Sequence, residues 1–418
     1  MDTRSYVANL LTRATAARGV MATLRTEIKD KVLRDAGNRM LARATYLKEE
    51  NRKDTENAAR TGMAPAMIDR LLLTDKRIEA MARALFDVAA LPDPVGEVIE
   101  GYRRPNGLRI QRVRIPIGVV VVIYESRPNV TADAAALCFK SGNVAILRGG
   151  KEALHSNLAI HSILAEALSA NQVDPAAIQL VETADRGAVE HLIAAEGAVD
   201  LVIPRGGESL IRAIAEKAKV PVIKHYKGVC HTFVDASADI EMAVRICMNA
   251  KVQRPAVCNA METMLVHRAI AAAFLPRIGA ELRAAGVEIR GCPETLGFIP
   301  DGKRATEDDW YAEYLDLILA VRVVDSLQTA IEHIERYGSH HSDAIVTRDR
   351  ASAQAFVERV DSAAVFVNCS TRFHDGGEFG LGAEIGISTD RLHARGPMGL
   401  RELTTYKFVV EGDGQVRT

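Results

Sequence analysis

Two residues stand out for the chemistry that they could do. Cys258 lies in a short polar break, residues 251–260 (KVQRPAVCNA), directly before a mostly apolar run. A cysteine thiolate is a strong nucleophile, although an isolated cysteine is more often a small buried hydrophobe. Asn129 closes the segment 124–129 (YESRPN) at the end of a β-branched run. Its side-chain amide could cap the following helix, or it could donate a hydrogen bond to an oxyanion during acyl transfer.

Two turns combine glycines with cationic side chains. Residues 147–152 (LRGGKE) and 203–209 (IPRGGES) each follow an expected strand and open an expected helix. Glycine permits close backbone approach and a helix N-terminus favours anions, while Arg148 and Lys151 add positive charge. One such turn could be an ordinary loop, but two at the same edge of one sheet favour a nucleotide with phosphates. The nearest match to a GxGxxG pattern, residues 380–386 (GLGAEIG), has the wrong spacing and is interpreted as a loop.

The histidines and cysteines do not form a metal-ligand pattern. His340, His341 and Asp343 lie close together, but adjacent residues on one element point in different directions and no third ligand follows at zinc spacing. We therefore interpret this segment as a polar loop. The six cysteines contain no CxxC pair, so neither a zinc ribbon nor a redox dithiol is indicated. The sequence predicts no metal site.

Composition and charge exclude several classes of function. The 418 residues suggest two or three domains, and 48% apolar with 26% charged residues is typical of a globular protein with a sizeable core. A net charge of -1 gives no reason to expect a nucleic acid or an anionic membrane as partner. No secretory pattern is visible, and no apolar run reaches the length of a membrane span. These features predict a cytoplasmic protein with reduced thiols.

The order of the expected elements indicates an α/β fold. Residues 1–90 are expected to be helical, and residues 95–114 alternate in the manner of exposed strands. Strands and helices alternate over residues 117–223, which specifies an open parallel sheet that binds ligands at the carboxyl ends of its strands. A second α/β region follows over residues 240–367. The expected last strand, residues 404–410, is short and terminal and could pair with another chain.

Taken together and in this order, these segments resemble the aldehyde dehydrogenase superfamily, and within it the enzymes that reduce γ-glutamyl phosphate. The resemblance covers nearly the whole chain. Its most specific parts are residues 122–131 (VIYESRPNVT), 253–260 (QRPAVCNA), 386–389 (GIST) and 392–400 (LHARGPMGL). It implies an aldehyde-dehydrogenase-like α/β fold with two parallel-sheet domains and a small β extension. The nucleotide-binding domain would comprise residues 1–97 and 115–227, the catalytic domain 228–403, and the extension, used for oligomerisation, 98–114 and 404–418.

The resemblance also implies roles for individual residues. Cys258 corresponds to the nucleophile of the superfamily and Asn129 to its oxyanion-binding asparagine. Glu313 falls near the glutamate that holds the nicotinamide ribose. The other residues expected at the cofactor are Arg148, Lys151 and Glu152 near the adenosine ribose and its 2′ substituent, and Gly206, Gly207 and Ser209 in the turn against the nucleotide. The implied cofactor is NADPH or NADP, favoured over NAD by the cationic Arg148 and Lys151.

One segment departs from the pattern of the superfamily. Oxidising members carry a glutamate base in a Glu-Leu-Gly-Gly-Lys motif, whereas the matching residues 223–228 (IKHYKG) contain no carboxylate. That base activates water for thioester hydrolysis, so its absence fits an enzyme that must avoid hydrolysis. The implied activity is the NADPH-dependent reduction of γ-glutamyl 5-phosphate to glutamate 5-semialdehyde and phosphate through a thioester on Cys258, in proline biosynthesis. The alternatives are an aldehyde dehydrogenase that makes a free acid and a non-catalytic binding subunit.

Four cations are candidates for the anionic groups of such a substrate. Lys224, His225 and Arg254 could bind the leaving phosphate and favour a thiolate at Cys258, and Arg127 could bind the α-carboxylate. These four assignments rest on charge and location in the sequence. The expected partners are γ-glutamyl phosphate, other copies of the chain in a homo-oligomer, and glutamate 5-kinase as the source of the acyl phosphate. Neither a nucleic acid nor a membrane is expected as a partner.

Overall fold

A computed structural model describes residues 2–224 and 226–417 of the chain. This part of the chain folds into two compact units. Unit 1 comprises Met1–Lys224, Gly380–Gly386 and Met398–Thr418, and unit 2 comprises His225–Phe379 and Ile387–Pro397. Residues 380–386 and 398–403 thus lie in the unit of the N-terminal half, whereas the sequence analysis placed them in the catalytic domain. Among the described residues, no helix is both long and apolar enough to cross a membrane.

Unit 1 begins with helices, as the helical spacing of its apolar residues predicts. They are α1 (Thr3–Met21), α2 (Thr26–Ala42), α3 (Ala44–Arg60), α4 (Pro65–Leu71) and α5 (Asp75–Ala90). The side chain of Asp2 caps α1 and that of Thr74 caps α5, because each accepts a hydrogen bond from a backbone N–H in the first turn. The predicted apolar face of α5 is buried, and it comprises Ile78, Met81, Leu85 and Val88.

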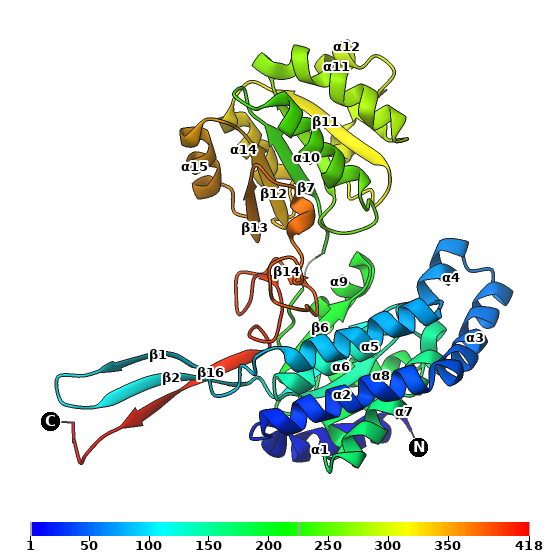
Figure 1. The fold of residues 1–418 in the computed structure, drawn as a ribbon, viewed down its shortest axis with the longest axis vertical. Helices are drawn as coiled ribbons and strands as arrows, with labels where there is room; N and C mark the ends of the chain where they lie inside the picture. Colours follow the sequence, from blue (N-terminus) through cyan, green and yellow to red (C-terminus); the bar gives the residue numbers. More distant parts are fainter. Residues whose placement is uncertain (1, 225, 418) are drawn as a thin grey trace. The chain divides into compact units, whose positions relative to one another are not determined.

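The sheet of unit 1 is parallel and has helices on both faces. Its strands are β3 (Val119–Tyr124), β4 (Val144–Arg148), β5 (Ile178–Leu180) and β6 (Leu201–Arg205), in the order β5-β4-β3-β6. The helices are α6 (Asn129–Lys140), α7 (Leu154–Ala170), α8 (Arg186–Ile193) and α9 (Glu208–Lys217), with short 3-10 turns η1 (Lys151–Ala153) and η2 (Pro175–Ala177). Helices α6 and α7 pack with α2, while α1 packs with α8 (Figure 1). Strand order reverses between β3 and β6, and ligands of such sheets bind at the carboxyl ends of the strands beside this point.

A small antiparallel sheet extends from unit 1. It consists of β1 (Val98–Arg103), β2 (Arg109–Pro116) and the C-terminal strand β16 (Thr404–Glu411), in the order β1-β2-β16 (Figure 1). β16 pairs with β2 along its whole length, from Thr404 opposite Pro116 to Glu411 opposite Arg109. The terminal strand therefore finds its first partner within its own chain. Large apolar side chains on this sheet are exposed, namely Val98, Tyr102, Tyr406, Phe408 and Val410.

Unit 2 contains a second parallel sheet. Its strands are β7 (Cys230–Val234), β8 (Met261–His267), β9 (Glu288–Gly291), β10 (Lys303–Arg304), β11 (Ile318–Val324), β12 (Ser342–Val346) and β13 (Ala364–Val367), in the order β10-β9-β11-β8-β7-β12-β13. The helices are α10 (Ile240–Val252), α11 (Arg268–Ala284), α12 (Pro293–Phe298), α13 (Glu307–Trp310), α14 (Leu327–Tyr337) and α15 (Arg350–Arg359). A 3-10 turn η3 (Thr371–Phe373) and the short pair β14 (Ile387–Ser388) and β15 (Gly396–Pro397) follow.

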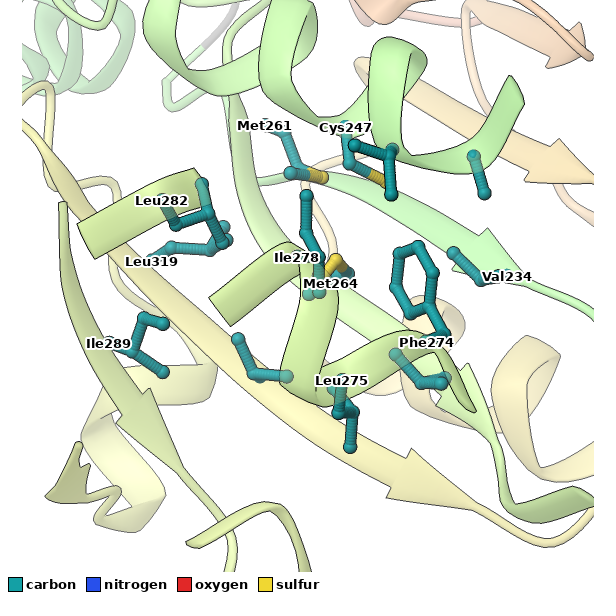
Figure 2. Packing of buried hydrophobic residues seen from close by; sticks show 14 of the residues in the cluster. Val234, Cys247, Met261, Met264, Phe274, Leu275, Ile278, Leu282, Ile289 and Leu319 are labelled. Atoms are coloured by element: carbon teal, nitrogen blue, oxygen red, sulfur yellow. The ribbon is translucent and has the colours of Figure 1, made fainter. Parts of the chain in front are cut away.

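The core of unit 2 fixes the strands that flank the candidate site. On one face of the sheet, side chains of β8 and β11 pack against α10 and α11, as Figure 2 shows for Cys247, Met264, Phe274 and Ile278. On the other face, Phe233 and Leu265 pack in a second cluster with residues of α14 and α15. Strands β7 and β8 are therefore held on both faces.

The structure corrects two expectations about strands. Residues 220–223 are predicted to form a strand, but only an isolated bridge joins Val222 to Val202. Pro221 has no backbone N–H to donate to a ladder. Conversely, β7 was not expected, because His231 and Thr232 interrupt its apolar pattern. Both side chains are nevertheless fully buried, at 0% exposure.

Candidate active site

Cys258 lies in the loop between α10 and β8, at the amino-terminal edge of the sheet of unit 2. It is partly exposed, whereas Cys138, Cys230 and Cys247 are buried. Burial raises the pKa of the Cys138 and Cys247 thiols to about 12, which keeps them protonated and unreactive. Among the cysteines, accessibility therefore separates Cys258 from the thiols of the core. Cys292 and Cys369 are also partly exposed, so accessibility alone does not select Cys258.

The backbone of Cys258 is held by the segment that precedes β7. The Cys230 thiol donates a hydrogen bond to the Cys258 carbonyl oxygen, with an S···O distance of 3.1 Å. A Cβ atom added to Gly228 would lie 2.0 Å from the same oxygen, so only glycine permits this approach. The Gly228 N–H in turn donates to the Glu313 carboxylate at 2.8 Å. Cys258 and Glu313, which the sequence analysis assigned to nucleophile and cofactor, are thus linked through Gly228 within unit 2.

A second support comes from η3, which the sequence analysis did not single out. The Asn259 amide donates to the His374 carbonyl oxygen at 3.0 Å, and the Thr371 hydroxyl donates to the Asn259 carbonyl oxygen at 2.7 Å. The Arg372 guanidinium donates to the side-chain oxygens of Asn259 and of Gln253, the latter at 2.9 Å. These hydrogen bonds join both ends of the Cys258 loop to one turn.

Arg372 also adds positive charge beside Cys258. Burial and the neighbouring Arg254 cation lower the pKa of Arg372, while Asp375 and Cys258 act in the opposite direction. Arg254, the predicted phosphate ligand on this loop, is exposed. Arg372 follows Ser370 and Thr371, more than a hundred residues after Cys258. Nothing in the local sequence indicates that it lies near Cys258. The structure therefore adds Arg372 to the candidate residues.

Asn129 is the first residue of α6 and is exposed. The prediction that its side chain caps this helix is wrong, because Pro128 occupies the N-cap position and no side chain caps the helix. Instead, the Asn129 amide donates to the Asp133 carboxylate one turn further along, at 2.8 Å. Burial raises the pKa of Asp133 to about 6, against the opposing effects of this hydrogen bond and of Arg205. An amide has two N–H donors, so Asp133 can orient Asn129 and leave one donor for a ligand.

The residues predicted to bind the adenosine ribose follow β4. Arg148 is partly buried and donates to the Gly149 and Ala184 carbonyl oxygens at 3.0 and 3.3 Å. Lys151 is exposed in η1. The Glu152 carboxylate accepts the N–H and the hydroxyl of Ser126 at 2.9 and 2.6 Å, and although burial opposes it, these hydrogen bonds lower the pKa of Glu152. The loops after β3 and β4 are thus tied together at the carboxyl edge of the sheet.

The predicted glycine turn follows β6. Gly206, Gly207 and Ser209 are all exposed. The Gly207 N–H donates to the Glu125 carboxylate at 2.8 Å, and a Cβ added to Gly206 would lie 2.5 Å from the same carboxylate. Glu125 is the first residue after β3, and the sequence analysis assigned it no role. It bridges β3 and β6 at the point where strand order reverses.

The remaining candidates for substrate binding are dispersed. Arg127 is exposed in the loop before α6, and Lys224 is partly buried at the end of the main segment of unit 1. His225 lies outside the described residues. The expectation of a polar loop is wrong for Asp343, which is the second residue of β12, whereas His341 lies in the bend before that strand. Both side chains are fully buried, and the Asp343 carboxylate accepts hydrogen bonds from the backbone N–H and the Nδ1 of His231, each at 2.9 Å.

Within the described ranges, no group of three or more His, Cys, Asp or Glu side chains is arranged to hold a metal ion. Unit 2 carries the partly exposed Cys258 thiol near the Arg372 cation, and unit 1 carries the Asn129 amide donor together with two glycine-rich turns at the carboxyl edge of its sheet.

Comparison with known proteins gives the same assignment over the full chain. Residues 2–292 match the profile of the aldehyde dehydrogenase family. The γ-glutamyl phosphate reductase of Geobacter metallireducens is 55% identical over 417 residues, which cover 100% of both chains. That of Carboxydothermus hydrogenoformans is 56% identical over 411 residues, which cover 98% of this chain and 99% of the relative.

Comparison with solved structures supports the same family assignment. The crystal structure of γ-glutamyl phosphate reductase from Thermotoga maritima matches with a TM-score of 0.97 and 49% identity, and the match covers 99% of this chain and 100% of that one. An acetylating aldehyde dehydrogenase from Geobacillus thermoglucosidasius has the same fold at 16% identity, with a TM-score of 0.69 over 100% of this chain and 98% of the other. The chain therefore belongs to the aldehyde dehydrogenase family and, within it, to the γ-glutamyl phosphate reductases.

Proposed function

We propose that this protein reduces γ-glutamyl 5-phosphate to glutamate 5-semialdehyde with release of phosphate, using NADPH, as the second step of proline biosynthesis from glutamate. The observation that carries the proposal is the surroundings of Cys258. The partly exposed Cys258 thiol lies near Arg372, whose charge interacts both with this thiol and with Arg254, and residues 223–228 offer no carboxylate that could activate water. This combination suits a thiol that accepts an acyl group from phosphate and does not hydrolyse it. The full-length similarity to γ-glutamyl phosphate reductases supports the choice of substrate.

In the first step, the Cys258 thiolate attacks the γ-carbonyl carbon of the substrate. A C–S bond forms, the bond from carbon to the phosphate oxygen breaks, and phosphate leaves with the electron pair. Arg254 and Arg372 stabilise both the thiolate and the departing phosphate, because guanidinium groups bind phosphate oxygens through paired N–H donors. We assign Lys224 and His225 to the same phosphate and Arg127 to the α-carboxylate, on charge and position in the chain.

The developing oxyanion needs a hydrogen-bond donor that is already in place. We assign this role to the side-chain amide of Asn129, and a single donor of this kind is typically worth about 3 kcal/mol. Asp133 orients the amide through the 2.8 Å hydrogen bond. Because one N–H is committed to Asp133, the amide cannot rotate freely, and the second N–H keeps a fixed direction.

The residues at the carboxyl edge of unit 1 fit a nicotinamide dinucleotide. Gly207 is open, since a Cβ there would meet only the Glu125 carboxylate at 3.9 Å, so the backbone after β6 can approach phosphates closely. Arg148 and Lys151 offer positive charge for a 2′-phosphate, which is why we propose NADPH, with Glu152 and Ser209 beside the nucleotide and Glu313 at the nicotinamide ribose. When bound, the cofactor supplies a hydride to the thioester carbonyl carbon. Cys258 then leaves as a thiolate and releases the aldehyde.

The small sheet suggests how copies of the chain associate. Its apolar side chains Tyr406, Phe408 and Val410 are about half exposed, at 47%, 55% and 55%. An exposed strand edge with apolar side chains is a ready surface for pairing. We therefore propose a homo-oligomer in which this sheet contacts another subunit, and glutamate 5-kinase as the partner that delivers the labile acyl phosphate.

The test is an assay in both directions. With glutamate, ATP and a γ-glutamyl kinase as the source of acyl phosphate, the protein should oxidise NADPH. With glutamate 5-semialdehyde and NADP, it should reduce the cofactor only when inorganic phosphate is present. Oxidation without phosphate would instead identify an aldehyde dehydrogenase that makes the free acid. A protein that binds nucleotide but turns over in neither direction would be a binding subunit.

A further inference from the structure

A buried ion pair brackets the loop that carries Cys258. Lys251 lies in the last turn of α10 and Glu262 is the second residue of β8. The Lys251 Nζ lies 2.5 Å from the Glu262 Oε2, and both side chains are 0% exposed. Burial raises the pKa of Glu262 to about 7 and lowers the pKa of Lys251. Since apolar packing commonly stabilises a fold at least as well as a buried ion pair, fold stability is a weak explanation for this one.

The backbone is distorted where Glu262 enters the sheet. Cys230 pairs with Met261 and His231 pairs with Thr263, so Glu262 is an extra residue in β8 opposite β7. Such a bulge changes the direction of a side chain and is rare between parallel strands. Here it lies beside Cys230, the residue whose thiol donates to the Cys258 carbonyl oxygen. The bulge therefore places Glu262 next to the support of the nucleophile.

The other carboxylate oxygen of Glu262 holds the loop that carries Glu313. The Leu315 N–H donates to the Glu262 Oε1 at 3.1 Å. Leu315 has a positive φ of 53°, which a leucine adopts only when its surroundings impose it. Two residues earlier, the Glu313 carboxylate accepts the Gly228 N–H at 2.8 Å, and Gly228 lies against the Cys258 backbone.

We infer that Lys251 and Glu262 are positioning residues that set the Cys258 loop and the Glu313 loop in a fixed relation to each other. Lys251 holds the end of α10 from which the Cys258 loop departs. Glu262 holds the start of β8, where that loop ends, and the backbone of the Glu313 loop. The inference rests on the proposed function for the roles of Cys258 and Glu313. Neither Lys251 nor Glu262 touches the reacting atoms, because both are sealed from solvent.

The charged and titratable groups that act most strongly on the pair lie on neighbouring elements. Asp316 and Cys230 act on Lys251, and Glu313 acts on Glu262. The Lys251 ammonium also lies 5.9 Å from the centre of the Tyr314 ring, in the same loop as Glu313. The pair is thus surrounded by residues of the two loops that it is proposed to position.

The experiment compares three variants with the wild type. Lys251→Met combined with Glu262→Leu replaces both charges with apolar groups, and Glu262→Gln keeps the shape and an acceptor for the Leu315 N–H. Two readouts are used, kcat and KM in the kinase-coupled assay, and the pH dependence of Cys258 alkylation by iodoacetamide, followed by peptide mass spectrometry. The third variant, Lys29→Met combined with Asp93→Leu, is the matched control, because Lys29 and Asp93 form a buried pair at 2.8 Å in unit 1.

We expect the variants of the Lys251–Glu262 pair to fold, with kcat lowered by about 100-fold for the double variant, as small misplacements of reacting groups can cost. The pH midpoint of Cys258 alkylation should move and KM for NADPH should rise, while the Lys29 and Asp93 control keeps all three values. Folded variants with the kcat and alkylation profile of the wild type would overturn the inference. Failure of every variant of the pair to fold would also overturn it, since the role would then be structural. The alkylation readout needs no turnover, so it stands even where the proposed reaction fails.

Discussion

The two units place their candidate residues at opposite edges of their sheets. In unit 1, the motifs follow β3, β4 and β6, at the carboxyl ends of the strands where α/β sheets usually bind ligands. In unit 2, Cys258 precedes β8, Glu313 precedes β11 and Gly228 precedes β7, at the amino ends. The candidate residues therefore lie at the carboxyl edge of the parallel sheet in unit 1 and at the amino edge of the parallel sheet in unit 2.

This difference has an electrostatic consequence. The carboxyl edge of unit 1 faces the N-termini of α6 and α9, whose partial positive charges favour phosphates. The amino edge of unit 2 faces the C-terminus of α10, whose partial negative charge disfavours a thiolate or a departing phosphate. For the proposed reaction, unit 2 would therefore need cations from side chains, and Arg254 and Arg372 are the candidates at the Cys258 loop. In the proposed reaction, helix dipoles would stabilise the cofactor phosphates in unit 1, and side-chain cations would stabilise the thiolate and the leaving phosphate in unit 2.

The largest effect should come from removing the thiol at the amino edge of unit 2. Cys258→Ala should lower NADPH-dependent reduction by more than about 1,000-fold, because the proposed acyl intermediate forms on this thiol. Nucleotide binding, measured by quenching of protein fluorescence, should not change, since the cofactor residues of unit 1 are intact. Cys292→Ala is the control for a partly exposed thiol elsewhere in unit 2. Near wild-type turnover by Cys258→Ala would show that Cys258 at the amino edge of unit 2 is not the nucleophile.

The next effect tests the one catalytic assignment at the carboxyl edge of unit 1. Asn129→Ala should lower kcat by about 100-fold, the usual loss for one oxyanion donor. Single-turnover acylation of Cys258 should slow by the same factor, while thiol alkylation proceeds at the wild-type rate. The exposed Asn38 of α2 offers a control as Asn38→Ala. If Asn129→Ala changed KM for NADPH and left kcat unaltered, the carboxyl edge would serve the cofactor only.

The third prediction concerns the cations of unit 2. Arg372→Met should lower kcat/KM by about 10-fold, because a charge-assisted phosphate contact and the hydrogen bonds to Asn259 and Gln253 are lost. Alkylation of Cys258 at neutral pH should slow as well. Arg372→Lys keeps the charge and loses the forked geometry, so it separates the two contributions. Arg350→Met, at an exposed arginine of α15, serves as control. Equal rates for Arg372→Met and the wild type would contradict the need for side-chain cations at this edge.

This contrast between the edges also explains what the sequence could predict. The βα alternation of unit 1 predicts its strands and helices because apolar β-branched runs such as residues 117–123 leave few alternatives. The turns after those strands follow in order, so Arg148, Lys151, Gly206 and Gly207 could be found from the strand ends. Local pattern and function coincide there.

In unit 2, the local sequence pattern does not reveal where the functional residues lie. The sequence did not predict β7 because His231 and Thr232 are buried polar residues. The backbone N–H and Nδ1 of His231 bond to Asp343, more than a hundred residues away. Arg372 reaches the Cys258 loop across a similar separation. The Asn129 cap was predicted from the preference of asparagine for helix starts, but the competing bond to Asp133 prevailed. Contacts between distant residues cannot be seen in a local pattern, and these are the contacts that build the amino edge.

A smaller effect should appear at the cofactor. Arg148→Gln should raise KM for NADPH by about fivefold and leave KM for NADH unchanged, because only NADPH carries a 2′-phosphate for the cation to bind. NADH thus serves as the control within one variant. The increase in KM for NADPH should shrink at high salt, since salt screens the attraction between a cation and a phosphate that both reach solvent. An equal increase in KM for NADPH and for NADH would contradict this role. Arg148 would then support the turn through its hydrogen bonds to the Gly149 and Ala184 carbonyl oxygens and would not bind the 2′-phosphate.

The smallest effect is on stability and depends on pH. The pKa of Asp133 is raised to about 6 by burial, so the folded protein binds this proton more tightly than the unfolded chain does. The stability from the protonated group is fully present below about pH 4 and is lost as the pH rises through 6. Asp133→Asn is neutral at every pH and can still accept the Asn129 N–H. Between pH 4 and pH 7, its free energy of unfolding should therefore rise relative to that of the wild type by up to about 2 kcal/mol. Thermal unfolding of both proteins across this range measures the gain, with Asp87→Asn at an exposed position of α5 as control. A difference that stays constant with pH would show that Asp133 orients Asn129 as a carboxylate throughout, and the carboxyl edge of unit 1 would then hold a permanent negative charge beside its oxyanion donor.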